Sequence, residues 1–117
     1  MNAEELKVRT KAFALRIMKL VDAMPRRLAG QVIARQILRS GTSVGANYRA
    51  ACRAQSRAEF SSKISIVLEE VDETLFWLEL LEESGLIKPE RLKELIKEAN
   101  ELLAIFIASR KTAKNAN

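Results

Sequence analysis

The sequence predicts an all-α protein, an antiparallel up-down-up-down four-helix bundle. The 117 residues include only two prolines and four glycines, so long stretches contain no helix breaker. Hydrophobic residues make up 48% of the chain and charged residues 30%, which is typical of a globular protein. Apolar residues recur at three- and four-residue steps in four segments with short connections. We expect one domain over residues 1–117, with helices at about 3–22, 30–54, 57–84 and 89–110 and a basic, frayed tail at 111–117.

The first predicted helix has a clear beginning and end. Asn2 followed by Glu5 forms a plausible capping box. Pro25 disfavours helical geometry at the residue before it, so the helix should end near Asp22. Its remaining surface is strongly basic, through Lys7, Arg9, Lys11, Arg16 and Lys19.

The second predicted helix carries two stripes on opposite faces. At about 100° per residue, five apolar side chains fall within about 60° of the helix circumference. Five arginines fall within about 80° on the opposite side. The apolar stripe is Ile33, Ile37, Val44, Tyr48 and Ala51, and the arginine stripe is Arg35, Arg39, Arg49, Arg53 and Arg57.

Gly41 and Gly45 lie within this segment and leave two alternatives open. Each glycine costs a helix interior about 1 kcal/mol relative to alanine, which is tolerable where a neighbouring helix packs closely. Alternatively, Gly41 ends one helix and the following Thr42 or Ser43 caps another. The apolar phase continues from Ile37 across both glycines without a slip, which favours one continuous helix.

The third predicted helix begins at a capping box and ends at a glycine. Ser56 and Glu59 fit the Ser-x-x-Glu pattern, in which each side chain bonds the backbone N–H of the other residue. Gly85 suits the C′ position that follows a helix. Residues 74–81 are apolar nearly all round, and a helix of that kind is buried on every side. We therefore predict an oligomer interface that includes Phe76, Trp77 and Leu80.

The fourth predicted helix begins at Pro89, a residue that suits the first turn of a helix. Glu90 follows, and its negative charge favours the same turn. Its apolar stripe consists of Leu92, Leu95, Ile96, Ala99, Leu102, Leu103 and Phe106.

Several absences narrow the function. The chain has no histidine, which excludes Ser-His-Asp and Cys-His catalysis and imidazole metal sites. The acidic cluster at 69–73 therefore lacks the histidines of ferritin-like metal sites. Cys52 is the only cysteine and has no base to activate it, so we expect a buried space-filler. We expect no enzyme activity, metal or cofactor. Without a signal peptide or a long apolar run, we also expect a cytoplasmic protein that is not bound to a membrane.

The charge of the chain is unevenly distributed. Residues 1–63 carry 13 Lys or Arg and 4 Asp or Glu, a net charge of +9. Residues 64–117 carry 7 and 11, a net charge of −4. Such a chain either pairs its two halves in the fold or presents a basic surface to an anionic partner.

Arginines spaced along a helix can follow a nucleic-acid backbone through its phosphates. We expect Arg35 and Arg39 to face such a partner, because few acids lie near them in the sequence. Arg49 and Arg53 have an equally good alternative, which is pairing with the acids at 69–73, either within the chain or between subunits. The candidate nucleic-acid-binding residues are Arg26, Arg27, Arg35, Arg39, Arg49, Arg53 and Arg57.

Three motifs in the middle of the chain resemble the four-helix family of bacterial ribosomal-RNA intervening-sequence proteins. They are Arg39-Ser40-x-x-Ser43-Val44-x-Ala46-Asn47, Ser56-x-x-Glu59-Phe60 and the acidic Glu69-Glu70-x-Asp72-Glu73. The family is similar to the accessory variability proteins of diversity-generating retroelements. The resemblance implies a homopentameric ring, no known enzymatic activity and a role in binding nucleic acid.

Two functions remain open at this point. The protein is either a nucleic-acid-binding module for RNA or DNA, or an assembly factor that contacts only another protein, such as a reverse transcriptase. Salt-sensitive binding of nucleic acid separates the two.

Overall fold

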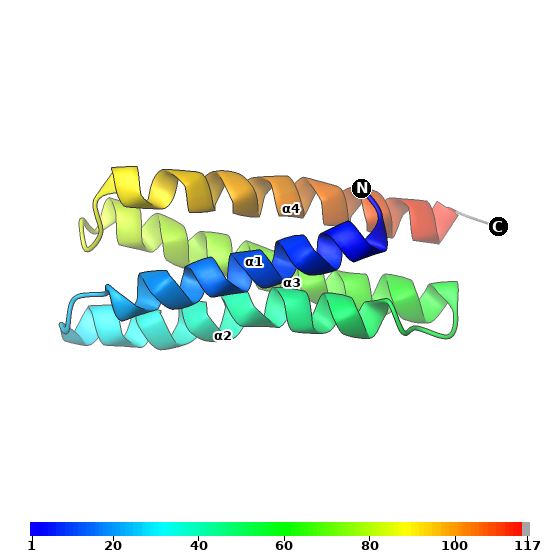
Figure 1. Ribbon diagram of the computed structural model, residues 1–117, viewed down its shortest axis with the longest axis horizontal. Coiled ribbons are helices and arrows are strands. Elements are labelled where there is room, and N and C mark those ends of the chain that lie inside the picture. The colour runs from blue at the N-terminus through cyan, green and yellow to red at the C-terminus, as the bar shows by residue number, and fades with distance from the viewer. Residues whose placement is uncertain (116–117) are drawn as a thin grey trace.

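Four α-helices run alternately up and down along one long axis (Figure 1). The computed structural model describes residues 1–115, and the fold measures 50 × 20 × 19 Å. The helices are α1 (Ala3–Asp22), α2 (Leu28–Ala51), α3 (Arg57–Glu83) and α4 (Pro89–Asn115). Each helix packs mainly against its neighbours in the chain, and α1 makes only a slight contact with α4. The predicted all-α up-down bundle is confirmed.

The ends of α1 follow from local chemistry. The Asn2 side-chain oxygen accepts a hydrogen bond from the Glu5 backbone N–H at 2.8 Å, which satisfies one free donor of the first turn. The helix ends at Asp22, three residues before Pro25. Both ends lie where the sequence places them.

The ends of α2 differ from the expected ones. The helix begins at Leu28, two residues early, and Arg27 provides no side-chain cap. It ends at Ala51, about three residues early, because the hydrogen bonds that follow span three residues instead of four. The backbone N–H groups of Arg53 and Ala54 bond to carbonyls only three residues back.

The start of α3 is a modified capping box. The Ser56 hydroxyl accepts from the Glu59 backbone N–H at 3.1 Å, as predicted. The Glu59 carboxylate, however, accepts from the backbone N–H of Gln55 at 3.0 Å, not from that of Ser56. The helix ends at Glu83, and Gly85 follows with a φ of 76°, a conformation that favours glycine.

The α4 helix is longer than expected. It begins at Pro89, as predicted, but continues to Asn115, beyond the expected end at residue 110. Residues 111–115 are therefore helical, which corrects the prediction of a frayed tail there. Lys114 lies in the last turn, where a positive charge interacts favourably with the helix dipole. The rest of the expected tail, residues 116–117, lies outside the described residues.

The core combines one face of each helix. Its three fully buried hydroxyl side chains, those of Thr10, Ser40 and Thr74, are all hydrogen-bonded. Thr74 and Ser40 join α3 to α2 through a 2.8 Å contact between their oxygens. Among residues 1–115, no buried side-chain polar atom lacks a partner. The largest fully buried side chains are Phe13, Phe106, Ile17, Ile37, Ile64, Leu78, Leu81, Leu92 and Leu102.

Gly41 and Gly45 lie inside α2, so the continuous helix is confirmed and the alternative of a break at Gly41 is wrong. Both glycines face α1. A Cβ atom on Gly41 would lie 2.9 Å from Cγ1 of Ile17, and one on Gly45 would lie 3.3 Å from Oγ1 of Thr10. The two helices therefore approach each other too closely for larger side chains at these positions.

We expect Gly41→Ala to lower the free energy of unfolding by about 1 kcal/mol. The added methyl group would overlap the fully buried Ile17, and overpacking of roughly 2 kcal/mol exceeds the gain of about 1 kcal/mol in helix propensity. Gly45→Ala is the matched comparison and should cost less stability, because its Cβ would lie 3.3 Å from the nearest atom of Thr10 and the same propensity gain applies. Urea unfolding of both variants measures the difference. A Gly41→Ala variant as stable as the original protein would contradict the close approach.

Candidate nucleic-acid interface

The five arginines of the predicted stripe do not lie on one helix. Arg35, Arg39 and Arg49 are on α2, Arg53 lies just beyond its end, and Arg57 is the first residue of α3. All five side chains are exposed. The prediction of a single stripe is therefore wrong, because the end of α2 at residue 51 interrupts the helical phase.

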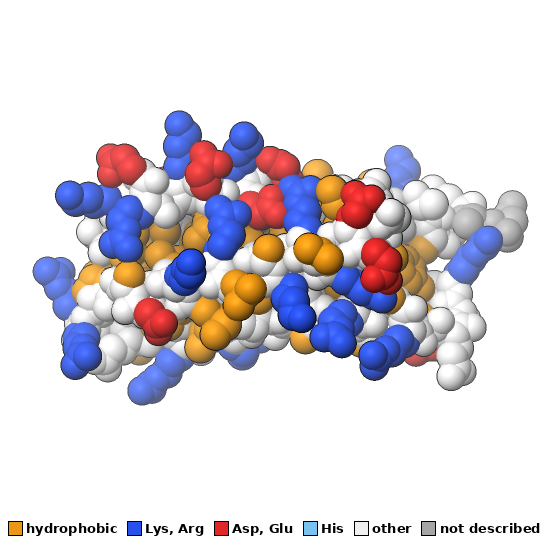
Figure 2. Space-filling model, in the orientation of Figure 1, with side chains coloured by type: hydrophobic (Ala, Val, Ile, Leu, Met, Phe, Trp, Pro, Cys, Tyr) orange, Lys and Arg blue, Asp and Glu red, His pale blue; other side chains and the backbone are white. Residues whose placement is uncertain are grey.

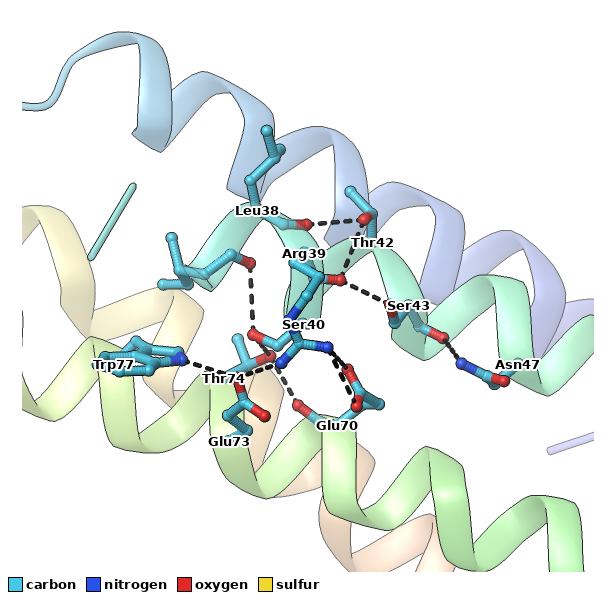
Figure 3. Close-up of polar contacts among 11 residues, drawn as sticks. Leu38, Arg39, Ser40, Thr42, Ser43, Asn47, Glu70, Glu73, Thr74 and Trp77 are labelled. Carbon is cyan, nitrogen blue, oxygen red and sulfur yellow. Dashed lines mark hydrogen bonds and ion pairs between the residues drawn. The ribbon is translucent and has the colours of Figure 1, made fainter. Parts of the chain in front are cut away.

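Arg39 is held by two acids of α3 (Figure 3). Its Nη1 lies 3.1 Å from Oε2 of Glu70, and its Nη2 pairs with Oε2 of Glu73. The indole N–H of Trp77 donates to the same Glu73 oxygen at 3.1 Å. This corrects the prediction that Arg39 faces a partner. Acids far away in the sequence lie beside it on the antiparallel helix.

The ion pair shifts both titrations toward the charged forms. The Glu73 pKa is lowered, first by the hydrogen bond from Arg39 and then by the one from Trp77. The Arg39 pKa is raised, first by its hydrogen bond to Glu73. Because the carboxyl pKa is lower in the folded state, the pair stabilises the fold above the unfolded pKa of about 4. The contribution disappears as the pH falls through the folded pKa of Glu73.

We expect Arg39→Gln to lower the melting temperature by a few degrees at most at pH 7, since about half of the Arg39 side chain is exposed to solvent, which weakens the pair. At a pH below the folded pKa of Glu73, the variant and the original protein should melt together. Arg49→Gln and Arg53→Gln should leave the melting temperature unchanged at both pH values. Thermal melts followed by circular dichroism measure all three. A pH-independent difference for Arg39→Gln would show that the ion pair is not its cause.

Arg49 and Arg53 line a groove between α1 and α2, about 480 Å³ in volume. Arg49 on α2 and Arg53 just beyond its end form one wall, while Lys7 and Lys11 form the α1 wall. Lys7 pairs with Glu4 of its own helix at 3.1 Å. Within residues 1–115, the other three cations make no ion pair. Within one chain, the described residues therefore show no pairing of Arg49 or Arg53 with α3; pairing between subunits stays a prediction.

The rest of the groove lining is small or aliphatic. Ala14, Gly45 and Ala46 lie between the two basic walls, with Val8 beside them on α1. Figure 2 shows how many Lys and Arg side chains gather over this face, with apolar side chains between them. We call this site the basic groove. Its lining residues are Glu4, Lys7, Val8, Lys11, Ala14, Thr42, Gly45, Ala46, Arg49 and Arg53.

The α1 wall of the basic groove is fixed from both sides. Toward α2, the close approach of Gly45 to Thr10 sets how near α1 lies to α2. Toward α4, the guanidinium of Arg9 binds both carboxylate oxygens of Glu98, at 2.7 and 2.6 Å. It also contacts Glu101 at 2.7 Å. This two-pronged pairing is geometrically specific, so it holds the N-terminal half of α1 in place.

Sequence reasoning missed Lys7 and Lys11 as site residues. A signal was available, because residues four apart share one helix face. That spacing does not reveal what the face lies beside. Their meeting with Arg49 and Arg53 depends on the register of α1 against α2, which the contact of Gly45 with Thr10 sets.

The other candidate arginines lie outside the basic groove. Arg26 and Arg27 are exposed in the α1–α2 connection, at the opposite end of the bundle from the N-terminus of α1 (Figure 1). Arg35 and Arg57 are exposed as well, but neither lines the groove. The structure thus brings only two of the seven candidates, Arg49 and Arg53, together with other cations in one groove.

The predicted interface residues form an incompletely covered surface on α3. Phe76 is 50% exposed, while Trp77 and Leu80 are half-buried. The rings of Phe76 and Trp77 meet edge to face, with centroids 5.1 Å apart. Within one chain, residues 74–81 are therefore not buried on every side. We call Phe76, Trp77 and Leu80 the apolar patch.

Other types of site find little support in the part of the chain that the structure describes. Residues 1–115 contain no group of three or more His, Cys, Asp or Glu side chains placed to hold a metal. Two acids of the 69–73 cluster, Glu70 and Glu73, are engaged by Arg39. Cys52 is a half-buried free thiol. None of the described helices combines the length and apolar character needed to cross a membrane.

Comparison with known proteins agrees with this architecture. A crystal structure from Bacteroides thetaiotaomicron, of a protein with unknown function from the S23 ribosomal protein family, is similar to this chain with a TM-score of 0.88. The two sequences are 39% identical, and the match covers 96% of this chain and all of that one. A comparison with curated proteins gave no match. The model of the 23S rRNA-intervening sequence protein family matches residues 4–108. The chain belongs to this family.

Proposed function

We propose that the protein binds the phosphate backbone of nucleic acid through the basic groove. The observation that carries this proposal is the placement of Lys7 and Lys11 across from Arg49 and Arg53, on opposite walls of one groove. Ion pairs within the described chain occupy only Lys7 among these four. Lys and Arg side chains are the principal phosphate ligands of nucleic-acid-binding proteins.

Binding of this kind should be insensitive to sequence. The lining contains no aromatic ring to stack on a base and no Asn or Gln to read a base edge. It also lacks a histidine, so the proposal assigns the basic groove no catalytic step. The name of the family links its members to intervening sequences of 23S rRNA, which makes RNA the first nucleic acid to test.

We expect the dissociation constant for mixed-sequence, single-stranded RNA to depend steeply on salt. If the four cations of one groove contact four phosphates, the slope of log K against log salt should be about −3. Fluorescence anisotropy titrations at 50, 100 and 200 mM salt measure this slope. No detectable binding at 50 mM salt would contradict the proposed function.

We further propose that the protein self-associates through the apolar patch. Half of the Phe76 surface is exposed next to Trp77, and aromatic residues are enriched at protein interfaces. The resemblance implies five copies in a ring. The same patch supports the second candidate function, an assembly factor that contacts only protein, if nucleic-acid binding fails. Light scattering at micromolar concentration measures the assembly directly.

A further inference from the structure

We infer that the basic groove accepts single-stranded nucleic acid in preference to a duplex. This inference rests on the proposed function and adds the class of ligand. Its first support is the placement of cations on both walls. A single strand lying in the groove has Lys7 and Lys11 on one side and Arg49 and Arg53 on the other. Because Gly45 lies against Thr10 in antiparallel helices, the two pairs are offset along the groove, so successive phosphates of the strand can contact first one pair and then the other.

The width of the site excludes a duplex. Two packed helices lie about 8–10 Å apart, and the groove is the hollow along their seam. A duplex is wider than this, because it carries two backbones around a stack of base pairs. It can therefore rest only on the rim, where its backbone contacts one wall at a time and gains fewer phosphate contacts.

The spacing along each wall suits one strand. Lys7 and Lys11 are four residues apart on α1, which corresponds to about 6 Å along the helix axis. Stacked nucleotides advance about 3.4 Å along one strand, so each wall spans about two phosphates. On the other wall, Arg49 lies in the last turn of α2 and Arg53 in the turn that follows it.

The floor leaves room for the sugar and base. Ala14, Gly45 and Ala46 are the smallest residues of the lining, and the volume of about 480 Å³ is typical of a ligand site. Glu4 is the one acid of the lining, and Lys7 pairs with it. Because α1 and α2 are antiparallel and Gly45 lies against Thr10, Glu4 is at the Arg53 end of the groove, so this end should hold phosphate less strongly than the Lys11 end.

The test fills the groove without changing its charge. Ala46 is exposed on the groove side of α2, so Ala46→Phe would occupy the space of a strand while the cations remain. Ala46→Leu is a smaller plug that guards against misfolding, which circular dichroism checks for both. Ala104→Phe, at an exposed position of α4, is the matched control. The probes are a labelled 12-nucleotide RNA of mixed sequence and the same RNA in a blunt duplex, both at 50 mM salt.

We expect the unmodified protein and Ala104→Phe to bind the single strand about tenfold more tightly than the duplex. Ala46→Phe should lose this preference, with duplex binding unchanged. Equal affinity of the unmodified protein for both probes, or unchanged single-strand binding by both plugged variants, overturns the inference. The proposed function would then still stand if removing the groove cations weakens binding. If the unmodified protein binds neither the single strand nor the duplex, both the inference and the proposed function are overturned.

Discussion

Replacing Lys11, Arg49 and Arg53 together with glutamine is expected to weaken binding of single-stranded RNA by about 100-fold at 0.1 M salt. These three groove cations have no ion-pair partner among the described residues. Each phosphate contact adds about 0.7 to the salt slope on a single strand, so three lost contacts reduce affinity by about two powers of ten at this salt. The slope itself should fall from about −3 to about −1.

The matched control removes the same charge elsewhere. Lys88, Lys93 and Lys97 are exposed outside the basic groove, and replacing all three with glutamine lowers the net charge equally. If overall charge drives binding, both triple variants should weaken it to the same degree. If RNA binds in the basic groove, the groove variant should lose much more affinity than the control variant. Neither variant should unfold, because exposed cations contribute little to stability.

Phe76→Glu is expected to convert the self-associated protein into a monomer at micromolar concentration. Assembly through the apolar patch would bury the new carboxylate without a partner, which costs several kcal/mol. Phe76 is a better position than Trp77 for this test. Its side chain is half exposed in the single chain, whereas Trp77 is less exposed and donates to Glu73.

Light scattering coupled to size exclusion separates the outcomes. Leu15→Glu introduces the same charge at a 56% exposed apolar position on α1, away from the patch. It should leave the assembly intact. A Phe76→Glu variant with the mass of the unmodified protein would show that the patch is not the interface. A monomeric unmodified protein would rule out self-association itself.

The helix pattern could be read from the sequence because it depends on local chemistry. Asn2 and Ser56 cap the helices they precede, and Gly85 supplies the left-handed conformation after α3. The unbroken apolar phase was also sufficient to carry α2 across Gly41. One predicted hydrogen bond of the capping box was still wrong. The Glu59 carboxylate accepts from the backbone N–H of Gln55, and not from that of Ser56.

The pairing of charges could not be read in the same way, because it depends on how the helices lie side by side. Arg39 meets Glu70 and Glu73 across 31 and 34 residues of sequence. Proximity in the sequence wrongly favoured Arg39 as free, and it left the pairing of Arg49 and Arg53 open. The Ser40–Thr74 contact fixes the register that brings Arg39 to these acids. No local pattern encodes that register.

The basic groove was hidden for a related reason. Its two walls come from helices whose relative rotation is set by Gly45 against Thr10. A helical wheel places Lys7 and Lys11 on a common face of α1 but does not show that Arg49 lies opposite. Sequence patterns thus gave two of the four cations, and the packing of α1 on α2 supplied the other two.

Lysine footprinting tests the central claim most directly. Brief acetylation, followed by mass spectrometry, reports how far a bound 12-nucleotide RNA protects each lysine. Lys7 and Lys11 lie in the basic groove, while Lys93 and Lys97 are exposed reference sites on α4. The basic groove predicts that saturating RNA slows acetylation of Lys7 and Lys11 several-fold and leaves Lys93 and Lys97 unchanged. Equal protection of all four lysines, or protection of the α4 pair alone, would contradict it.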